Sequence, residues 1–297
     1  MHYISTASEA GTSDISELAR FIADHKIKAV FAVFERRDCP LDFRGFHSKI
    51  RIESFMKKIN FGGLYKNMLG IIGAMEEEVA ELKKDMQIDE TIEQAGMVFC
   101  KGSLGGKDVV IVRSGIGKVN AGICAQILVD RFGVDTLINT GIAGSLDAQI
   151  DIGDMVISTD ALYHDMDATI FGDPAGQIPR MDTLSFPADE KLVKKAVAAN
   201  EKANPDIHTF TGRVVSGDQF ISDKDVKERI SSLFHPMCVE MEGAGIAQAA
   251  YLNKVSYVII RAISDKADNS ATMDYPTFEK KAIAHSVRLM KELLPMI

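Results

Sequence analysis

The chain has 297 residues, 46% of them hydrophobic, and a formal net charge of −8 at pH 7. With a mean hydropathy of +0.02, this composition excludes a disordered or fibrous protein, and the length allows one large domain with an appendage or two small domains. The longest unbroken apolar run, Ala29–Phe34, is far shorter than the roughly 18 residues of a membrane span. We therefore expect a globular cytoplasmic protein without a membrane partner.

The four cysteines suggest neither a disulfide framework nor a metal site. Cys39, Cys100, Cys124 and Cys238 stand far apart, with no CxxC pair and no cysteine–histidine cluster at ligand spacing. Cys100 and Cys124 lie within apolar segments, where a free thiol behaves as a small hydrophobic side chain. We expect reduced thiols and no bound metal.

Charge is distributed unevenly along the chain. Residues 1–67 carry 11 basic and 8 acidic side chains, whereas residues 68–297 carry 23 basic and 34 acidic ones. The acidic remainder would repel a polyanion, so we expect no nucleic-acid partner. Within the basic segment, Ser13–His25 predicts a short helix and Ile27–Phe34 a strand, while residues 35–67 lack periodicity and are typical of a linker or a translated leader.

From Met68 onward, short apolar segments alternate with amphipathic ones. Strands are expected at Leu69–Ala74, Lys107–Arg113, Thr136–Asn139, Asp154–Ser158, Gly212–Ser216, Met237–Glu240 and Ser256–Ala262. Helices are expected at Glu76–Met86, Lys118–Phe132, Ala188–Lys202, Asp223–Phe234, Gly243–Leu252 and Tyr275–Leu294. This order predicts an α/β fold, a three-layer α/β/α sandwich around a mixed, largely parallel sheet.

Chemically useful side chains gather at the predicted strand ends, where such sheets bind ligands. They lie in Met75–Glu78, Ser114–Gly117, Asn139–Gly144, Glu240–Glu242 and Ser264–Asp265. Taken singly, each cluster has a structural interpretation. Acids at a helix start complement the helix dipole, short glycine runs form turns, the two glutamates of the fourth cluster can be solvated, and an aspartate can cap a turn. Their joint position at strand ends is what indicates an active site.

The same segments resemble bacterial 5′-methylthioadenosine/S-adenosylhomocysteine nucleosidases. The resemblance begins with MLGIIGAMEEEV at 68–79 and continues through SGIGKVNA at 114–121, NTGIAGSL at 139–146, DIGDMVIS at 151–158 and YHDMDATIFG at 163–172. It then includes GQIP at 176–179, VSGDQFI at 215–221, VEMEGAGIAQ at 239–248 and RAISDKAD at 261–268. Because it covers residues 68–297 in order, it implies a catalytic domain there with the nucleoside phosphorylase-like fold of that superfamily.

Residues 1–67 lie outside the resemblance. We expect this N-terminal extension to be dispensable for catalysis or partly disordered. The alternative is a small helix–strand module that docks on the sheet or recruits a partner, which the apolar run Ala29–Phe34 permits.

The resemblance implies hydrolysis of the N-glycosidic bond of 5′-methylthioadenosine and S-adenosylhomocysteine to adenine and a 5-thioribose, without a cofactor. 5′-Deoxyadenosine is a further candidate substrate, and the implied setting is methionine salvage and recycling of S-adenosylmethionine by-products. Adenine is a poor leaving group unless it is protonated. The oxocarbenium-like ribose also needs a water on the side opposite the base, a problem parallel to glycoside hydrolysis.

By motif position, the resemblance assigns the two catalytic carboxyl groups to Asp265 and Glu78. Asp265 corresponds to the acid that protonates N7 of adenine, and Ser264 would hold its carboxyl group in position. Burial in an apolar pocket can raise the pKa of such an acid. Glu78 corresponds to the base that orients and deprotonates the water. Glu76 and Glu77 are expected to face outward.

The remaining assignments implied by the resemblance concern binding of the nucleoside. Glu242 corresponds to the residue that binds the ribose hydroxyls, beside the Met241 backbone. Its carboxylate would stabilise the positive charge that develops on the ribose in the transition state. Arg261 would hold Glu242 or the water. Phe220 would stack on adenine and the Ile221 main chain would meet the base edge, with Gly144 in the same substrate site.

The resemblance also implies an apolar pocket for the 5′-thio substituent, lined by Ile116, Met75, Met241 and Tyr275. Phe171 and Pro179 from a second copy of the chain would close it, so a homodimer is implied. The alternative for these aliphatic and aromatic side chains is simple core packing.

Two rival functions remain. A nucleoside phosphorylase of the same fold would need arginines beside the first glycine loop to bind phosphate, whereas this loop carries three glutamates that would repel it. A non-catalytic nucleoside-binding or storage protein would not need both Glu78 and Asp265. Ile142 and Gly243 depart from the residues common in the family, so the preference among methylthioadenosine, S-adenosylhomocysteine, 5′-deoxyadenosine and aminofutalosine-type nucleosides stays open.

Overall fold

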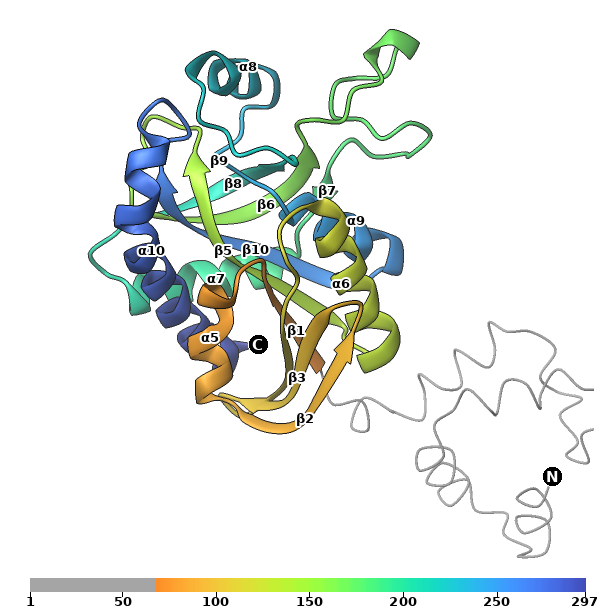
Figure 1. The fold of residues 1–297 in the computed structure, drawn as a ribbon, viewed down its shortest axis with the longest axis vertical. Coiled ribbons are helices and arrows are strands. Elements are labelled where there is room, and N and C mark those ends of the chain that lie inside the picture. The colour runs from red at the N-terminus through yellow and green to blue at the C-terminus, as the bar shows by residue number, and fades with distance from the viewer. Residues whose placement is uncertain (1–67) are drawn as a thin grey trace, which may run out of the picture. The chain divides into compact units, whose positions relative to one another are not determined.

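A computed structural model describes residues 68–297, in which a mixed sheet carries helices on both faces (Figure 1). The strands are β1 (Met68–Gly73), β2 (Gln87–Gln94), β3 (Met97–Leu104), β4 (Lys107–Arg113), β5 (Thr136–Ser145), β6 (Met155–Tyr163), β7 (Phe186–Pro187), β8 (Thr209–Ser216), β9 (Cys238–Glu240) and β10 (Ser256–Asp265). The α-helices are α5 (Glu76–Asp85), α6 (Lys118–Phe132), α7 (Glu190–Ala203), α8 (Lys224–Phe234), α9 (Gly243–Asn253) and α10 (Ala271–Leu293). The helix and strand predicted within residues 13–34 lie outside the described residues.

The strands follow the order β10-β6-β8-β9-β5-β1-β4-β3-β2, and β7 pairs with β6. Because β10 also pairs with β5, the five strands β10, β6, β8, β9 and β5 form a closed ring of pairings. Parallel pairings join β1 to β4 and β5, β5 to β10, and β8 to β6 and β9, and the remaining pairings are antiparallel. The α/β sandwich with a mixed sheet that the sequence predicts is therefore confirmed.

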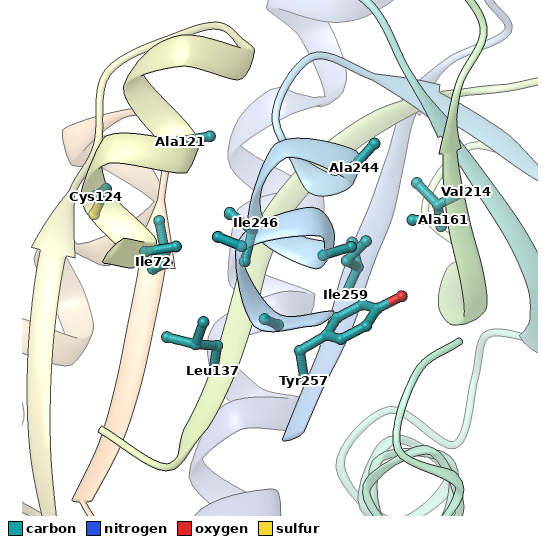
Figure 2. Packing of buried hydrophobic residues seen from close by; sticks show 14 of the residues in the cluster. Ile72, Ala121, Cys124, Leu137, Ala161, Val214, Ala244, Ile246, Tyr257 and Ile259 are labelled. Carbon is teal, nitrogen blue, oxygen red and sulfur yellow. The ribbon is translucent and has the colours of Figure 1, made fainter. Parts of the chain in front are cut away.

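Successive side chains of the central strands point to opposite faces of the sheet, so the apolar core is divided between these two faces. Ile72 and Leu137 pack beneath α6 and α9, as Figure 2 shows, whereas their neighbours Ile71 and Ile138 pack beneath α5, α7 and α10. Small side chains such as Ala121 on α6 let the first pair of helices lie close to the sheet. Both faces are covered, which is why the central strands read as continuous apolar runs.

The hairpin of β2 and β3 has no counterpart among the predicted elements. Its turn is Ala95–Gly96, with φ of 53° and 73°, the positive values that suit a two-residue hairpin. The side chains of β2 are almost all exposed, so no alternation of apolar residues marks it as a strand. Edge strands of this polar kind carry little sequence signal.

The predicted end of the strand Thr136–Asn139 is wrong, and so is the alternative interpretation of the following glycines as a turn. β5 continues to Ser145 and is buried along nearly its whole length. A side chain at Gly141 would overlap the Glu78 carboxylate and the Arg261 guanidinium. The glycine is therefore required for close approach within a strand rather than for a turn.

Two further sequence expectations can be compared with the described residues. Cys100, Cys124 and Cys238 are free and buried, as expected of reduced thiols, while Cys39 lies outside the described part. Among residues 68–297, no helix combines the length and the apolarity needed to cross a bilayer.

Candidate active site

A cavity of about 240 Å³ lies where several strands of the sheet end. Its wall includes most of the residues that the sequence assigns to the substrate: Met75, Glu78, Ile116, Gly144, Phe220, Ile221, Met241, Glu242, Ser264, Asp265 and Tyr275. It also includes Ala74, Ile142, Ala143, Gln219, Val239 and Glu240. Arg261, Phe171 and Pro179 are outside this wall. The fold thus brings together segments up to 200 residues apart in the sequence, as the contact between Met75 and Tyr275 illustrates.

Glu78 lies in the first turn of α5 and is the one member of its acidic triplet that turns inward. Its side chain is 4% exposed, whereas Glu76 and Glu77 are exposed, as expected. Its carboxylate accepts three backbone N–H groups, from Ala74 at 2.7 Å, Met75 at 3.0 Å and Ile142 at 3.1 Å. Burial raises the pKa of Glu78, although Arg261 and these N–H groups oppose the rise.

Asp265 is the last residue of β10 and is also buried. Its Oδ1 accepts the backbone N–H of Ala267 at 2.8 Å, and its Oδ2 accepts the Ser264 hydroxyl at 2.9 Å. Burial raises the pKa of Asp265, against the lowering effect of these two donors. A Cβ at Gly144 would lie 2.8 Å from Oδ1, so the glycine leaves the space that this carboxyl group occupies.

A buried ion pair joins Glu240, in the cavity wall, to Arg261 outside that wall. Arg261 donates from Nη2 to Glu240 and to Asn139 Oδ1, the latter at 2.5 Å, and only 1% of Arg261 is exposed. Its distance to Glu242 is 3.9 Å, so Glu240 is the main partner instead of Glu242. Sequence reasoning missed this pair, although an arginine inside an apolar strand needs a buried acid, and Glu240 ends another apolar strand.

Glu242 lies in the cavity wall close to this ion pair. Its Oε1 accepts the backbone N–H of Gly117 at 2.8 Å. Burial, reinforced by the neighbouring Glu240 charge, raises the pKa of Glu242 to about 8. Arg261 opposes this rise, but it donates to Glu240 and lies 3.9 Å from Glu242.

The mouth of the cavity is apolar and partly open. Phe220 is 50% exposed and meets the ring of Tyr275 edge-to-face at 5.9 Å between centroids. The Tyr275 hydroxyl donates to Glu279 at 2.9 Å and lies 3.5 Å from the Met75 sulfur. Ile116 is 54% exposed at the same mouth. Such exposed apolar side chains provide a surface that an apolar substituent can cover.

Phe171 and Pro179 belong to the segment between β6 and β7. Phe171 is 85% exposed, its neighbour Ile170 is 87% exposed, and Pro179 is exposed as well. Neither Phe171 nor Pro179 lines the cavity of its own chain.

Comparisons with known proteins agree with this geometry. The sequence model of the Phosphorylase superfamily matches residues 68–295. A 5′-methylthioadenosine/S-adenosylhomocysteine nucleosidase of Staphylococcus carnosus is 43% identical over 228 residues, which is 76% of this chain and 99% of the relative.

Two solved structures are similar to the described fold. The nucleosidase of Colwellia psychrerythraea in complex with adenine is 40% identical, with a TM-score of 0.74 over 77% of this chain and 95% of that one. The futalosine hydrolase of Helicobacter pylori is 32% identical, with a TM-score of 0.74 over 78% of this chain and 99% of that one. On its identity to the staphylococcal enzyme and its coverage of that enzyme, the chain belongs to the 5′-methylthioadenosine/S-adenosylhomocysteine nucleosidase family of the phosphorylase superfamily.

Proposed function

We propose that the chain hydrolyses the N-glycosidic bond of 5′-methylthioadenosine and S-adenosylhomocysteine, releasing adenine and the corresponding 5-thioribose. The observation that carries this proposal is a pair of buried carboxyl groups, Glu78 and Asp265, which face one cavity from different elements and have pKa values raised by burial. The related nucleosidases are named for these two substrates, and one of them holds adenine. The reaction belongs to methionine salvage and the recycling of S-adenosylmethionine by-products.

Asp265 is the general acid in this proposal. Its raised pKa lets the carboxyl group carry a proton to N7 of adenine while the bond between C1′ and N9 breaks and its electron pair passes to the base. The Ala267 N–H and the Ser264 hydroxyl then stabilise the aspartate that remains. Phe220 and Ile221, which line the same cavity, hold the adenine ring in this proposal.

Glu78 is the general base. It accepts a proton from a water whose oxygen forms the new bond to C1′, so the proton lost by Asp265 to adenine is matched by one gained at Glu78. The three N–H donors fix the orientation of the carboxylate before substrate arrives. Arg261, held in place by Glu240, adds a positive charge that favours the ionised base.

Glu242 and Met241 bind the ribose. With a pKa of about 8, Glu242 can donate as well as accept a hydrogen bond, which suits a pair of sugar hydroxyls. Burial and the neighbouring Glu240 are the causes of this raised pKa of Glu242. Met75, Ile116 and Tyr275 form the apolar end of the cavity for the 5′-thio substituent, with Gly144 leaving space beside Asp265.

The active species in this proposal is a homodimer in the cytoplasm. The exposed Phe171 and Pro179 of a second copy would cover the open mouth beside Ile116 and Phe220. Sedimentation at the assay concentration measures this association directly. A fully active monomer would contradict it.

The two rivals make different demands on the site. Phosphorolysis needs cationic side chains around a phosphate, and the described cavity wall contains neither lysine nor arginine. Arg261 lies outside that wall and is already bound to Glu240. A non-catalytic binding protein would gain nothing from two buried carboxyl groups whose ionised forms are disfavoured.

A phosphate-free assay of adenine release tests the proposal. The purified protein should convert 5′-methylthioadenosine and S-adenosylhomocysteine to adenine at a rate that added phosphate does not increase. Phosphate dependence with formation of a ribose 1-phosphate would instead indicate the phosphorylase, and binding without product would indicate the storage protein. Including 5′-deoxyadenosine and aminofutalosine ranks the substrates, since a futalosine hydrolase shares the fold.

A further inference from the structure

Lys227 on α8 is a partly buried cation that contacts the loop directly after Asp265. Its side chain is 19% exposed, and its ammonium group donates to the backbone carbonyl of Lys266. The Asp268 carboxylate lies 3.8 Å from the same ammonium group. Another lysine of α8, Lys224, is 67% exposed and lies near Glu228 at 3.7 Å, so the helix offers a matched exposed cation.

The carbonyl that Lys227 binds belongs to the same peptide group as the N–H that holds the acid. The Lys266 carbonyl and the Ala267 N–H are the two ends of one planar amide, and that N–H donates to Asp265 Oδ1 at 2.8 Å. A cation on the oxygen of an amide polarises its N–H and makes it a stronger donor. Lys227 therefore acts on the Asp265 carboxyl group through one peptide bond.

The backbone at this peptide is held in an unusual conformation. Ala267 is fully buried with a φ of 50°, a left-handed value uncommon for a residue with a side chain. Its Cβ fills the space left by Gly144, where an added Cβ would lie 2.8 Å away. Such a conformation persists only when its surroundings fix it, and the bond from Lys227 is one of the contacts that do so.

We propose that Lys227 is a positioning residue for the general acid, fixing and polarising the 266–267 peptide so that its N–H holds the Asp265 carboxyl group in the orientation that delivers a proton to the base. This rests on the proposed nucleosidase function. Ser264 donates to the same carboxyl group, and Asp268 and Asp274 oppose its ionisation. Lys227 itself is close to Asp268, Lys266 and Asp265.

The test compares Lys227→Met with Lys227→Arg and Lys224→Met. Lys227→Met keeps a long side chain but loses the charge and the donors. We expect kcat to fall by up to roughly 100-fold, which is the loss in rate typical of a misplaced catalytic group. Lys227→Arg retains a cationic donor and should recover most of that loss. Lys224→Met, on the same helix, should leave kcat unchanged.

A second readout separates positioning from folding. The Asp265 carboxyl group can be titrated by ¹³C NMR in protein labelled at aspartate, with Asp265→Asn identifying its signal. Loss of Lys227 weakens the N–H donor to the ionised acid and removes a nearby positive charge, so the pKa of Asp265 should rise. The alkaline limb of the kcat profile should move to higher pH with it, which a lower melting temperature alone would not cause.

The outcomes are distinguishable. An unchanged Asp265 titration in Lys227→Met overturns the proposal, even if the variant is less stable. An unchanged kcat in a folded Lys227→Met protein also overturns it. If the wild-type protein releases no adenine, the nucleosidase function is wrong, and the NMR titration still decides whether Lys227 acts on Asp265.

Discussion

The two carboxyl groups of the cavity differ in what surrounds their oxygens. Glu78 accepts three backbone N–H groups and is close enough to Arg261 for that charge to favour its ionised form. Asp265 accepts one N–H group and one hydroxyl, and two further aspartates oppose its ionisation. Burial raises the pKa of both, but the ionised form is better supported at Glu78.

This difference suits the opposite tasks that we propose for two chemically similar side chains. Hydrolysis needs one carboxyl group that carries a proton and one that accepts a proton in the same site at the same pH. Glu78 lies at a helix start rich in N–H groups and Asp265 at a strand end with fewer donors, which fits the base and acid roles proposed for them. The activity should then fall in acid, as Glu78 is protonated, and in alkali, as Asp265 is ionised.

The largest effect is expected from removing the acid. Asp265→Asn can still contact N7 of adenine but has no proton to give, so kcat should fall by about 10² to 10⁴ or more. Affinity for a non-hydrolysable nucleoside analogue should stay close to that of the wild type. Steady-state kinetics and calorimetric titration measure the two quantities. Near-normal turnover would remove Asp265 from the mechanism.

Removing the proposed base should lower kcat about as much as removing the proposed acid. Glu78→Gln leaves the water without a proton acceptor, and a loss of about 10² to 10⁴ in kcat is expected, again with binding largely kept. Glu76→Gln and Glu77→Gln are the matched controls, since both side chains are exposed. A purely helix-dipole effect would instead give three similar stability losses of about 0.3 to 1 kcal/mol, which melting curves would show.

The elements around these groups could largely be predicted from sequence, and the exceptions have physical causes. β4 and α6 have the predicted bounds because apolar periodicity and flanking glycines mark them. β5 was predicted too short because a glycine needed for close approach to Glu78 has the same sequence signal as a turn glycine. The Arg261–Glu240 pair was missed because its partners lie 21 residues apart and meet only through the pairing of strands.

Glu242 extends the comparison to a third carboxyl group. Its pKa is raised from 4.5 to about 8, so the folded chain binds a proton that the unfolded chain releases between these pH values. Stability should therefore fall as pH rises through that window, by roughly 3 kcal/mol between pH 4.5 and 7. Glu242→Gln should lack this dependence.

Denaturant unfolding at several pH values gives the free energy of unfolding of wild type and Glu242→Gln. The difference between the two isolates Glu242, because the contributions of Glu78 and Asp265 are present in both proteins and largely cancel. Glu77→Gln serves as the control, because its exposed side chain should leave the wild-type pH dependence intact. Parallel curves for wild type and Glu242→Gln would show that Glu242 is ionised in the folded protein.

A smaller effect is expected from substituting the two glycines of β5, each of which faces one of the two carboxyl groups proposed to be catalytic. A Cβ at Gly141 would overlap Glu78 and Arg261, whereas one at Gly144 would lie 2.8 Å from Asp265 Oδ1. Alanine at either position should destabilise by about 1 to 3 kcal/mol through overpacking. Gly141→Ala should shift the acid limb of the pH profile and Gly144→Ala the alkaline limb. Identical shifts would mean that the two carboxyl groups do not act separately.

The smallest effect is expected from deleting residues 1–67. We propose that this extension is dispensable for catalysis, because within the described chain the hydrogen-bond partners of Glu78 and Asp265 all come from residues 74–267. The staphylococcal relative is matched over 99% of its length by 228 residues of this chain, and the family match begins at Met68. A chain starting at Met68 should therefore fold, associate and cleave 5′-methylthioadenosine with unchanged kcat/KM and an unchanged pH profile. The full-length protein, prepared in parallel, is the control. If the shortened chain is insoluble, or if either limb of its pH profile moves, the extension supports the site and the proposal is wrong.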